Sequence, residues 1–272
     1  MSDTSGGSNL AHRILSACVF VPVVLGLTWA GGWALFALVV AIVGRGTWEL
    51  LHLAHQSGQR PATTVGVILA LGTCTYLQLR GADGGFLLWL TAATLMALVV
   101  SLRQGVQGYL ANALLTLAGV NMIALLGSSP LLLSARLGDS APVLLVALFG
   151  SIWLTDAVAY GGGRLLGRRR LAPTISPGKT IAGFVSGLVG GLLPMVLYSQ
   201  LPGWSFVELA GLFFLVAASS QLGDLVESAI KRDLGVKDAP ALIPGHGGLL
   251  DRFDSYFFAF PVAFIYTVFL KS

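Results

Sequence analysis

Nine apolar segments, separated by short polar stretches, cover most of this 272-residue chain. A helix needs roughly 20 apolar residues to cross a bilayer core about 30 Å thick, because each residue adds about 1.5 Å. The segments are residues 14–30, 33–53, 65–79, 86–102, 109–127, 142–162, 180–199, 206–230 and 255–270. We therefore predict an all-α fold, a polytopic bundle of about nine transmembrane helices.

The amino-acid composition agrees with a membrane protein and excludes the other broad classes of protein. Hydrophobic residues make up 55% of the chain and charged residues 10%, whereas soluble domains carry about 25% charged residues. A soluble enzyme is excluded, and so is a disordered chain, because this much apolar surface has to be buried. The net charge of +4 does not indicate nucleic-acid binding, since no basic soluble stretch is present. Cys18 and Cys74 lie in apolar runs and indicate neither a disulfide nor a zinc site.

The positions of the basic residues predict an orientation. We expect residues 1–11 to form a polar tail and residues 12–272 to form one transmembrane domain, with residues 14–30 as an uncleaved first span. With nine spans and the N-terminus inside, all but three of the 16 basic residues fall on the inner side, as the positive-inside rule requires. The exceptions are Arg80, Arg136 and Lys271. The C-terminus is then expected outside.

Acidic residues in the later spans mark the candidate site. A carboxylate at the centre of a membrane helix costs about 2.5–3.5 kcal/mol on insertion scales, so such residues are typical of functional sites. Asp156 and Asp224 lie near the inner ends of predicted spans, and Asp251 precedes the last span. Glu49 is the one acid in a span before residue 150, and its position near an inner helix end is as consistent with reaching the surface as with a role in the site.

Four polar residues of one predicted span share a helical face. Asp224, Glu227, Ser228 and Lys231 are spaced i, i+3, i+4 and i+7, which places them on a single stripe. Taken alone, the stripe is as consistent with packing ion pairs as with a functional site.

The polar segment 164–179 joins two predicted spans. Its three consecutive arginines, 168–170, are typical of a topology anchor that meets anionic lipid. Ser176, Lys179 and Thr180 are different, because they surround Pro and Gly at the start of a predicted helix. Backbone amides, hydroxyls and a lysine at such a place can bind phosphate oxygens. The pattern is not a Walker loop, since that motif's upstream glycine is absent.

The segment 228–254 carries the densest set of polar residues. It is longer and more charged than a connection between two helices needs to be. Residues suited to surround phosphate oxygens are Lys231, Arg232, Gly245, Gly247 and Gly248. Asp224 and Asp251 supply oxygen ligands of the kind that hard divalent ions prefer. Phosphate, cation and membrane together predict a reaction on a lipid phosphate.

At these residues the chain resembles the phosphatidate cytidylyltransferases, or CDP-diacylglycerol synthases. That family's signature is Ser, two residues, Lys-Arg, four residues, Lys-Asp, then Pro-x-His-Gly-Gly and Asp-Arg-x-Asp, and it is matched from Ser228 to Asp254. The segments 156–160, 176–180 and 221–228 agree as well. The N-terminal half agrees in hydropathy alone. The family commonly has Glu where this chain has Ala182, so we infer that the Glu is supportive or that activity is altered here.

The resemblance implies that CTP and phosphatidic acid give CDP-diacylglycerol and pyrophosphate, at a site within residues 150–256 that faces the cytoplasm from the inner membrane. It implies catalytic roles for Asp224, Asp251 and Lys231. Asp224 and Asp251 would hold Mg²⁺. Asp156 would be a third ligand or would hold a ligand in place. A second cation could bind as well. The substrate-binding residues would be Ser176, Lys179, Thr180, Ser228, Arg232, His246, Gly247, Gly248 and Arg252. His246 would donate to pyrophosphate or fix its loop, and the enzyme would be a homodimer.

Two other functions stay open from the residues alone. A CTP-dependent enzyme acting on a polyprenol or archaeol-type lipid would need the same metal and phosphate residues. A secondary transporter also carries carboxylates in membrane helices. A transporter is expected to have an inverted repeat and acids near the midplane, whereas this chain shows no repeat and its acids gather at one face.

Overall fold

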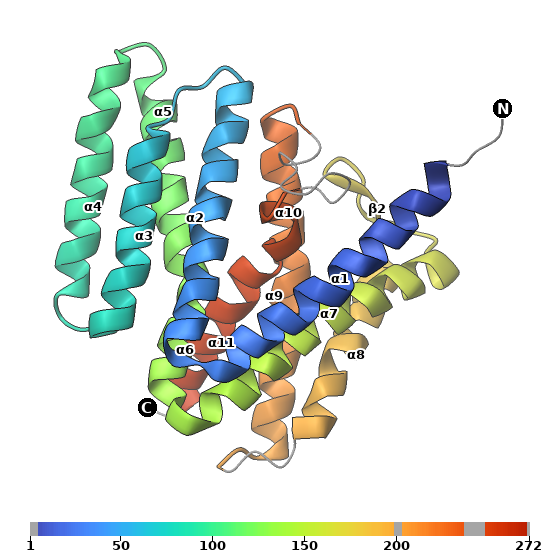
Figure 1. Cartoon of the computed structure of the whole chain (residues 1–272). Helices are drawn as coiled ribbons and strands as arrows, with labels where there is room; N and C mark the ends of the chain where they lie inside the picture. Colours follow the sequence, from blue (N-terminus) through green and yellow to red (C-terminus); the bar gives the residue numbers. More distant parts are fainter. Residues whose placement is uncertain (1–4, 199–202, 237–247, 271–272) are drawn as a thin grey trace.

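The computed structural model describes residues 5–198, 203–236 and 248–270, with side chains from Cys18 to Val196 and in the two later ranges. Apolar helices dominate these residues (Figure 1). They are α1 (Ser5–Ala30), α2 (Gly32–Gln56), α3 (Thr63–Arg80), α4 (Phe86–Ser101), α5 (Tyr109–Ala118), α6 (Ser129–Leu137), α7 (Ala141–Leu166), α8 (Ile181–Tyr198), α9 (Phe206–Asp233), α10 (Leu250–Phe253) and α11 (Tyr256–Leu270). Short 3-10 and π segments, η1 (Leu102–Gln104), η2 (Gly119–Leu125) and η3 (Gly138–Ser140), connect some of them.

Five stretches of this described chain are long and apolar enough to cross a membrane. They are residues 32–56, 86–104, 109–166, 206–233 and 250–270. The stretch 109–166 contains two of the predicted spans, and its ends, α5 and α7, follow different paths in the bundle (Figure 1). Shorter apolar helices cover Cys18–Ala30 and Ile181–Val196. The chain is therefore a polytopic helical membrane protein, while the count of nine spans and their orientation stay predictions.

The first two helices form a tight hairpin. α1 begins at Ser5, inside the stretch expected as a polar tail, and a single residue separates it from α2. Gly31 and Gly32 have φ values of 63° and 49°, a backbone region that glycine adopts without a Cβ penalty. This turn reverses the chain, so that α1 and α2 meet at one end and diverge toward their other ends (Figure 1).

A small antiparallel hairpin is added to the helical bundle. β1 (Arg170–Ala172) pairs with β2 (Ser176–Thr180) in the segment that we expected to be a loop. Proline lacks a backbone donor, so Pro173 and Pro177 prevent a helix from continuing through this segment. Thr180 ends the strand and its Oγ1 accepts a hydrogen bond from the Gly183 amide at 3.0 Å, as an N-cap does. The prediction that a helix opens after Thr180 is confirmed.

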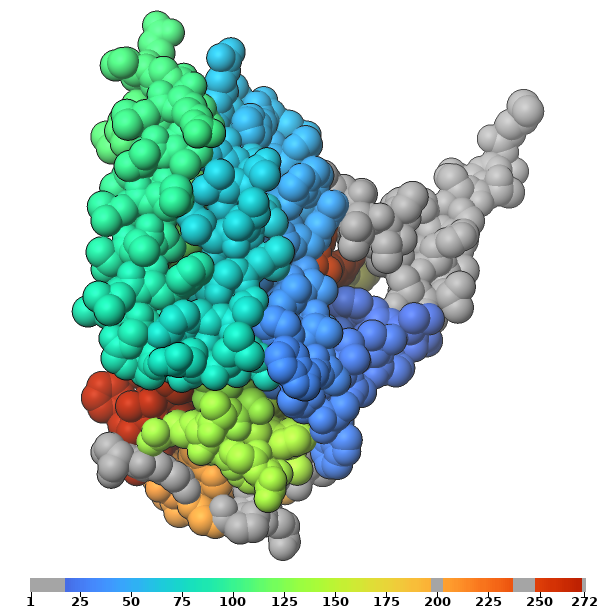
Figure 2. All heavy atoms as spheres, turned by 60° about the vertical axis from the view of Figure 1, so that its left-hand side comes forward, coloured from blue at the N-terminus to red at the C-terminus, as the bar shows by residue number. Residues whose placement is uncertain are grey.

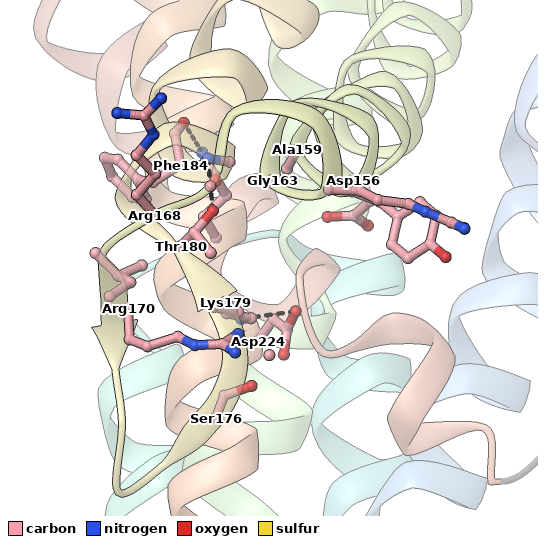
Figure 3. A pocket seen from close by; sticks show the side chains of 17 residues that line it. Asp156, Ala159, Gly163, Arg168, Arg170, Ser176, Lys179, Thr180, Phe184 and Asp224 are labelled. Atoms are coloured by element: carbon pink, nitrogen blue, oxygen red, sulfur yellow. Dashed lines mark hydrogen bonds and ion pairs between the residues drawn. The ribbon is translucent and has the colours of Figure 1, made fainter.

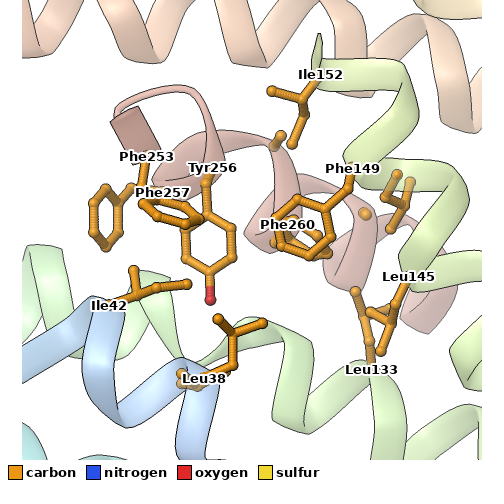
Figure 4. Close-up of a cluster of buried hydrophobic side chains, with 14 of the residues drawn as sticks. Leu38, Ile42, Leu133, Leu145, Phe149, Ile152, Phe253, Tyr256, Phe257 and Phe260 are labelled. Carbon is orange, nitrogen blue, oxygen red and sulfur yellow. The ribbon is translucent and has the colours of Figure 1, made fainter. Parts of the chain in front are cut away.

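A buried aromatic cluster anchors α11 to the rest of the bundle (Figure 4). Tyr256 packs against Phe149 of α7 and Phe260, with ring centroids 5.9 and 4.8 Å apart. Its hydroxyl donates to the Gly127 carbonyl, so the buried polar group is satisfied. This cluster fixes the start of α11, which follows directly after the candidate site residues 251–254.

The wall formed by α7 and α8 depends on small residues. A Cβ on Gly183 would lie 2.8 Å from the Ala159 carbonyl oxygen, and one on Gly190 would lie 2.8 Å from that of Leu154. Glycines at such positions let helix backbones approach closely in membranes.

The face of the bundle away from this wall is covered by α3 and α4 (Figure 2). It carries exposed apolar side chains such as Leu88 and Val99.

Candidate active site

A cavity of about 590 Å³ opens beside the hairpin and is lined by α7, α8, α9, β1, β2 and the residues before β1. Asp156 of α7, Asp224 of α9 and Lys179 of β2 line it together with Ser176 and Thr180 (Figure 3). The hairpin thus brings the predicted phosphate segment to the predicted metal ligand on α9.

The central pair of the cavity is Lys179 and Asp224. Lys179 Nζ lies 2.7 Å from Asp224 Oδ2, and the two side chains are 25% and 33% exposed. Ser228, one turn further along α9, directs its hydroxyl at Asp224 Oδ1 at 3.4 Å. Both charges reach the cavity, so a phosphate can replace the carboxylate beside Lys179 and a cation can replace the ammonium beside Asp224. We call Lys179, Asp224 and Asp156 the cavity cluster.

A second ion-pair group joins α9 to α10 and does not line this cavity. Lys231 Nζ is 2.7 Å from Glu227 Oε2 and 2.7 Å from Asp251 Oδ1. Asp251 Oδ2 also accepts a hydrogen bond from the Gly248 amide at 3.2 Å. We call Lys231, Glu227 and Asp251 the buried cluster, since their side chains are 12%, 6% and 17% exposed. The predicted stripe on α9 is confirmed, because Ser228 and Lys231 each reach the acid four residues earlier.

Asp254 connects the two clusters electrostatically. It interacts with Asp156, Asp224 and Glu227, although we did not assign it a role from the sequence. The signal was present, since Asp254 ends the Asp-Arg-x-Asp motif three residues after Asp251. The chain approaches α9 closely here: a Cβ on Gly223 would lie 2.8 Å from the Asp254 carbonyl oxygen.

The carboxylates suit a divalent cation. Asp156 and Asp224 line one cavity and interact electrostatically, and carboxylate oxygens are ligands that Mg²⁺ accepts. Within the part of the chain that the structure describes, no three acidic, His or Cys side chains are grouped to hold a metal ion. Mg²⁺ usually takes one or two carboxylates and completes its shell with waters and substrate phosphates, so the residues fit an ion that arrives with a nucleotide.

Several predicted substrate residues have other contacts or lie elsewhere. Arg232 donates to the carbonyls of Ile175 at 3.4 Å and Val236 at 3.2 Å, which ties the hairpin to the end of α9. Arg252 is an exposed residue of α10. His246 and Gly247 lie outside the described residues.

Basic residues that we interpreted as a lipid anchor line the cavity. Arg164, Arg168 and Arg170 belong to its wall, whereas Arg169 does not. The sequence could not distinguish them, because three adjacent arginines carry no sign of which side chain turns inward. The structure supplies that difference, because Arg170 begins β1 and faces the cavity while Arg169, just before the strand, does not line it.

Glu49 neither reaches the surface nor lines the cavity. Its side chain is fully buried, and its two oxygens accept hydrogen bonds from the backbone amides of Leu249 at 3.0 Å and Leu250 at 2.7 Å. Arg45 Nε lies 2.7 Å from Glu49 Oε1. This acid of α2 therefore binds the start of α10, some 200 residues away.

Ala182 lies in the first turn of α8 and is not part of the cavity wall. A glutamate there would stabilise the helix N-terminus through the helix dipole. This position favours the first interpretation, in which the glutamate common in the family stabilises the start of the helix and is not required for catalysis.

A polytopic helical bundle with lysine, arginines and carboxylates around one cavity has the residues of a membrane enzyme that acts on phosphate groups. The chain belongs to the cytidylyltransferase family, whose model matches residues 11–270, and so it is a nucleotidyltransferase. It is 36% identical over 261 residues to the phosphatidate cytidylyltransferase of Brucella abortus (strain 2308), covering 91% of this chain and 89% of the relative. The enzymes of that name from Synechocystis and Pseudomonas aeruginosa are 32% and 34% identical, over 95% and 93% of this chain and 97% and 95% of the relatives. The resemblance seen in the motifs is confirmed.

Proposed function

We propose that this chain is a phosphatidate cytidylyltransferase, which transfers the cytidylyl group of CTP to phosphatidate and releases pyrophosphate. The observation that carries the proposal is the cavity in which Lys179, Asp224 and Asp156 meet. Similarity to phosphatidate cytidylyltransferases over about nine-tenths of the chain supports the same substrates.

In this reaction the protein has to position the two substrates and neutralise the charge of their phosphates. A phosphate oxygen of phosphatidate attacks the α-phosphorus of CTP, the new P–O bond forms, and the bond to the β-phosphate oxygen breaks. The attacking phosphate is already ionised, so no general base is needed. Lys179, with Ser176 and Thr180 beside it, would hold phosphate oxygens at the hairpin. The remaining proposed contacts are Lys231, Arg232, Arg252, Ser228, His246, Gly247 and Gly248.

Mg²⁺ is the proposed cation, with Asp224 and Asp251 as ligands and Asp156 as a third ligand or as a residue that holds a ligand in place. When bound, the ion would neutralise charge on the phosphates of CTP. Asp224 and Asp156 are favoured by their shared cavity. Asp251 would have to exchange Lys231 for the cation, because its Oδ1 lies 2.7 Å from Lys231 Nζ. A second cation is part of the proposal and has no assigned ligands.

We propose nine spans, with the N-terminus and the cavity on the cytoplasmic side. The hairpin, the end of α9 and α10 lie toward one end of the bundle, and α11 ends at the other (Figure 1). With Cys18 and Cys74 replaced, single cysteines at Gly108 and Asp238 should be labelled from the inside, and one at Gly203 from the outside. Labelling of the Asp238 position from outside would contradict cytoplasmic access for CTP.

We also propose a homodimer on the family resemblance. Crosslinking in the membrane, followed by separation by mass, would test the dimer independently of activity.

An acceptor series tests the substrate. Purified protein receives labelled CTP with phosphatidate, a polyprenyl phosphate or an archaeol-type lipid, and labelled lipid is separated from nucleotide. We expect labelled lipid with phosphatidate and background with the other two. Preferred labelling of either alternative would replace phosphatidate as the substrate, and no labelled lipid with any acceptor would contradict the enzyme activity.

A further inference from the structure

We propose that Arg170 binds a substrate phosphate inside the cavity, whereas its neighbour Arg169 does not. The inference deepens the proposed function, because it assigns a phosphate-binding role to a residue of the arginine triplet. The ligand chemistry is a phosphate ester, which can come from the headgroup of phosphatidate or from the polyphosphate of CTP.

The first observation is where the side chain points. Arg170, the first residue of β1, lines the cavity. In Figure 3 its guanidinium extends toward the ion pair of Lys179 and Asp224, above Ser176. Arginine, lysine and a hydroxyl are thus presented from the two strands of one hairpin. A planar guanidinium can bind two phosphate oxygens at once, which gives it an orientation that an ammonium lacks.

The second observation is that the Arg170 side chain has no partner among the described side chains. Its backbone pairs with Thr180 in the hairpin, but its guanidinium makes no hydrogen bond or ion pair with residues 18–196, 203–236 or 248–270. Lys179, by contrast, is paired with Asp224. A guanidinium that lines a cavity and is not paired with a described carboxylate is available for an anionic ligand.

The third observation is the charge of the cavity as a whole. Its wall carries the four cations Arg164, Arg168, Arg170 and Lys179 against the two carboxylates Asp156 and Asp224. The formal excess is positive before any metal ion binds, which complements the negative charge of phosphate esters. A surface anchor for lipid headgroups would not need Arg170 turned toward Asp224 and Lys179 (Figure 3).

Arg169 offers a matched control, because it has the same charge, lies in the same segment and is also exposed. It does not line the cavity, and its backbone carbonyl accepts the Ile181 amide at 3.0 Å. Arg170→Gln, Arg170→Lys and Arg169→Gln should be compared in one membrane preparation. The kcat and the KM for each substrate are measured with the other substrate saturating.

We expect Arg170→Gln to lower kcat/KM by roughly ten- to a hundredfold, the effect of one lost charge-assisted hydrogen bond. The kcat/KM of Arg170→Lys should lie between those of Arg170→Gln and the wild type, and that of Arg169→Gln should stay within about twofold of the wild type. A rise in the KM for CTP alone identifies the nucleotide as the source of the phosphate, and a rise in the KM for phosphatidate alone identifies the lipid. Equal effects of Arg170→Gln and Arg169→Gln would overturn the inference. A wild-type protein without turnover would instead contradict the proposed function.

A different observation carries a second inference: we infer that Glu49 is a positioning residue for α10. Its carboxylate accepts both the Leu249 and Leu250 amides, and α10 carries Asp251. The first amides of a helix have no partner within the helix, so a buried carboxylate that binds them fixes where the helix begins. α2 would thereby set the place of Asp251 without touching a substrate.

Glu49→Gln tests this inference, with Thr47→Val as its control. Thr47 is also buried in α2, but its hydroxyl contacts the Gly119 carbonyl and not α10. We expect Glu49→Gln to speed amide hydrogen exchange at Leu249 and Leu250 at least tenfold and to lower kcat, with the KM for CTP nearly unchanged. Thr47→Val should leave exchange in α10 at the wild-type level.

The inference is overturned if Glu49→Gln exchanges like the wild type in α10, or if faster exchange there leaves kcat unchanged. Should Glu49→Gln not fold, Glu49→Asp keeps the negative charge near Arg45 but shortens the side chain by one methylene, which draws the oxygens away from the two amides. This milder variant should change the same two measurements in the same direction, and wild-type values in both would also overturn the inference.

Discussion

Two lysine–carboxylate clusters each include a carboxylate of α9, and they differ in what they can reach. The cavity cluster joins Lys179 and Asp224, which are 25% and 33% exposed. In the buried cluster, Lys231 is 12% exposed and contacts two acids at 2.7 Å each. Similar ion pairs thus sit in different surroundings, one beside an open cavity and the other inside the bundle.

The difference shows how one helix can serve two purposes. A pair that lines a cavity can exchange its partner for a ligand at lower cost, because both residues already border the space that the ligand would fill. A pair inside the bundle is costly to separate, since each charge would be left without compensation. We therefore expect the cavity cluster to bind reactants and the buried cluster to hold Asp251 in place until a cation competes for it.

The largest effect is expected at Asp224. Asp224→Asn should reduce turnover to background and leave the folded protein in the membrane, because the change removes a metal-binding charge with little change of shape. Turnover is measured with labelled CTP and phosphatidate, and added CTP should not restore it. Asp233→Asn, at the exposed end of the same helix, is the control and should keep the wild-type rate. A near-normal rate of Asp224→Asn at ordinary Mg²⁺ would show that the metal assignment is wrong.

Substitutions in the buried cluster should lower turnover nearly as much as Asp224→Asn does. Asp251→Asn should also abolish turnover, since it removes a proposed metal ligand and a partner of Lys231. If the cluster acts as one unit, the double variant Asp251→Asn/Lys231→Gln should be no worse than the more damaged single variant. Because turnover is already lost in Asp251→Asn, the variants are compared by thermal unfolding in detergent, and destabilisations that simply add would mean that the two residues act separately.

A smaller effect is expected at the hairpin. Lys179→Gln should lower the rate by about ten- to a hundredfold, which corresponds to about 1.5–3 kcal/mol for a charge-assisted hydrogen bond. Arg169→Gln, which is outside the cavity, should be mild, and both variants should insert normally. Equal, mild effects of Lys179→Gln and Arg169→Gln on turnover and CTP affinity would mean that Lys179 is a lipid anchor and not a phosphate ligand.

The smallest effect concerns the wall behind the cavity cluster. Gly190→Ala should destabilise the protein by about 1–3 kcal/mol through overpacking, because its Cβ would meet the Leu154 carbonyl oxygen at 2.8 Å. Gly161→Ala is the matched control, since a Cβ there meets nothing within 4 Å. The measurement is thermal unfolding in detergent. Equal unfolding temperatures for the two variants would contradict the close approach of α7 and α8.

Local patterns of the sequence predicted the parts of the site that depend on local geometry. The stripe on α9 followed from helical spacing alone, and the helix start at Thr180 followed from the apolar run that begins there. The inward turn of Arg170 could not be predicted, because it depends on a hairpin that three adjacent arginines do not indicate. The role of Glu49 was also hidden, since its partners lie 200 residues further along the chain.

The central claim is that the cavity cluster carries out cytidylyl transfer, and position-specific labels test it most directly. Wild-type and Asp224→Asn proteins receive phosphatidate with CTP labelled in either the α- or the γ-phosphate. We predict that the wild type moves the α-label into lipid and the γ-label into pyrophosphate in equal amounts, and that Asp224→Asn moves neither. Transfer of the γ-label to lipid, or α-transfer by Asp224→Asn at the wild-type rate, would contradict the account.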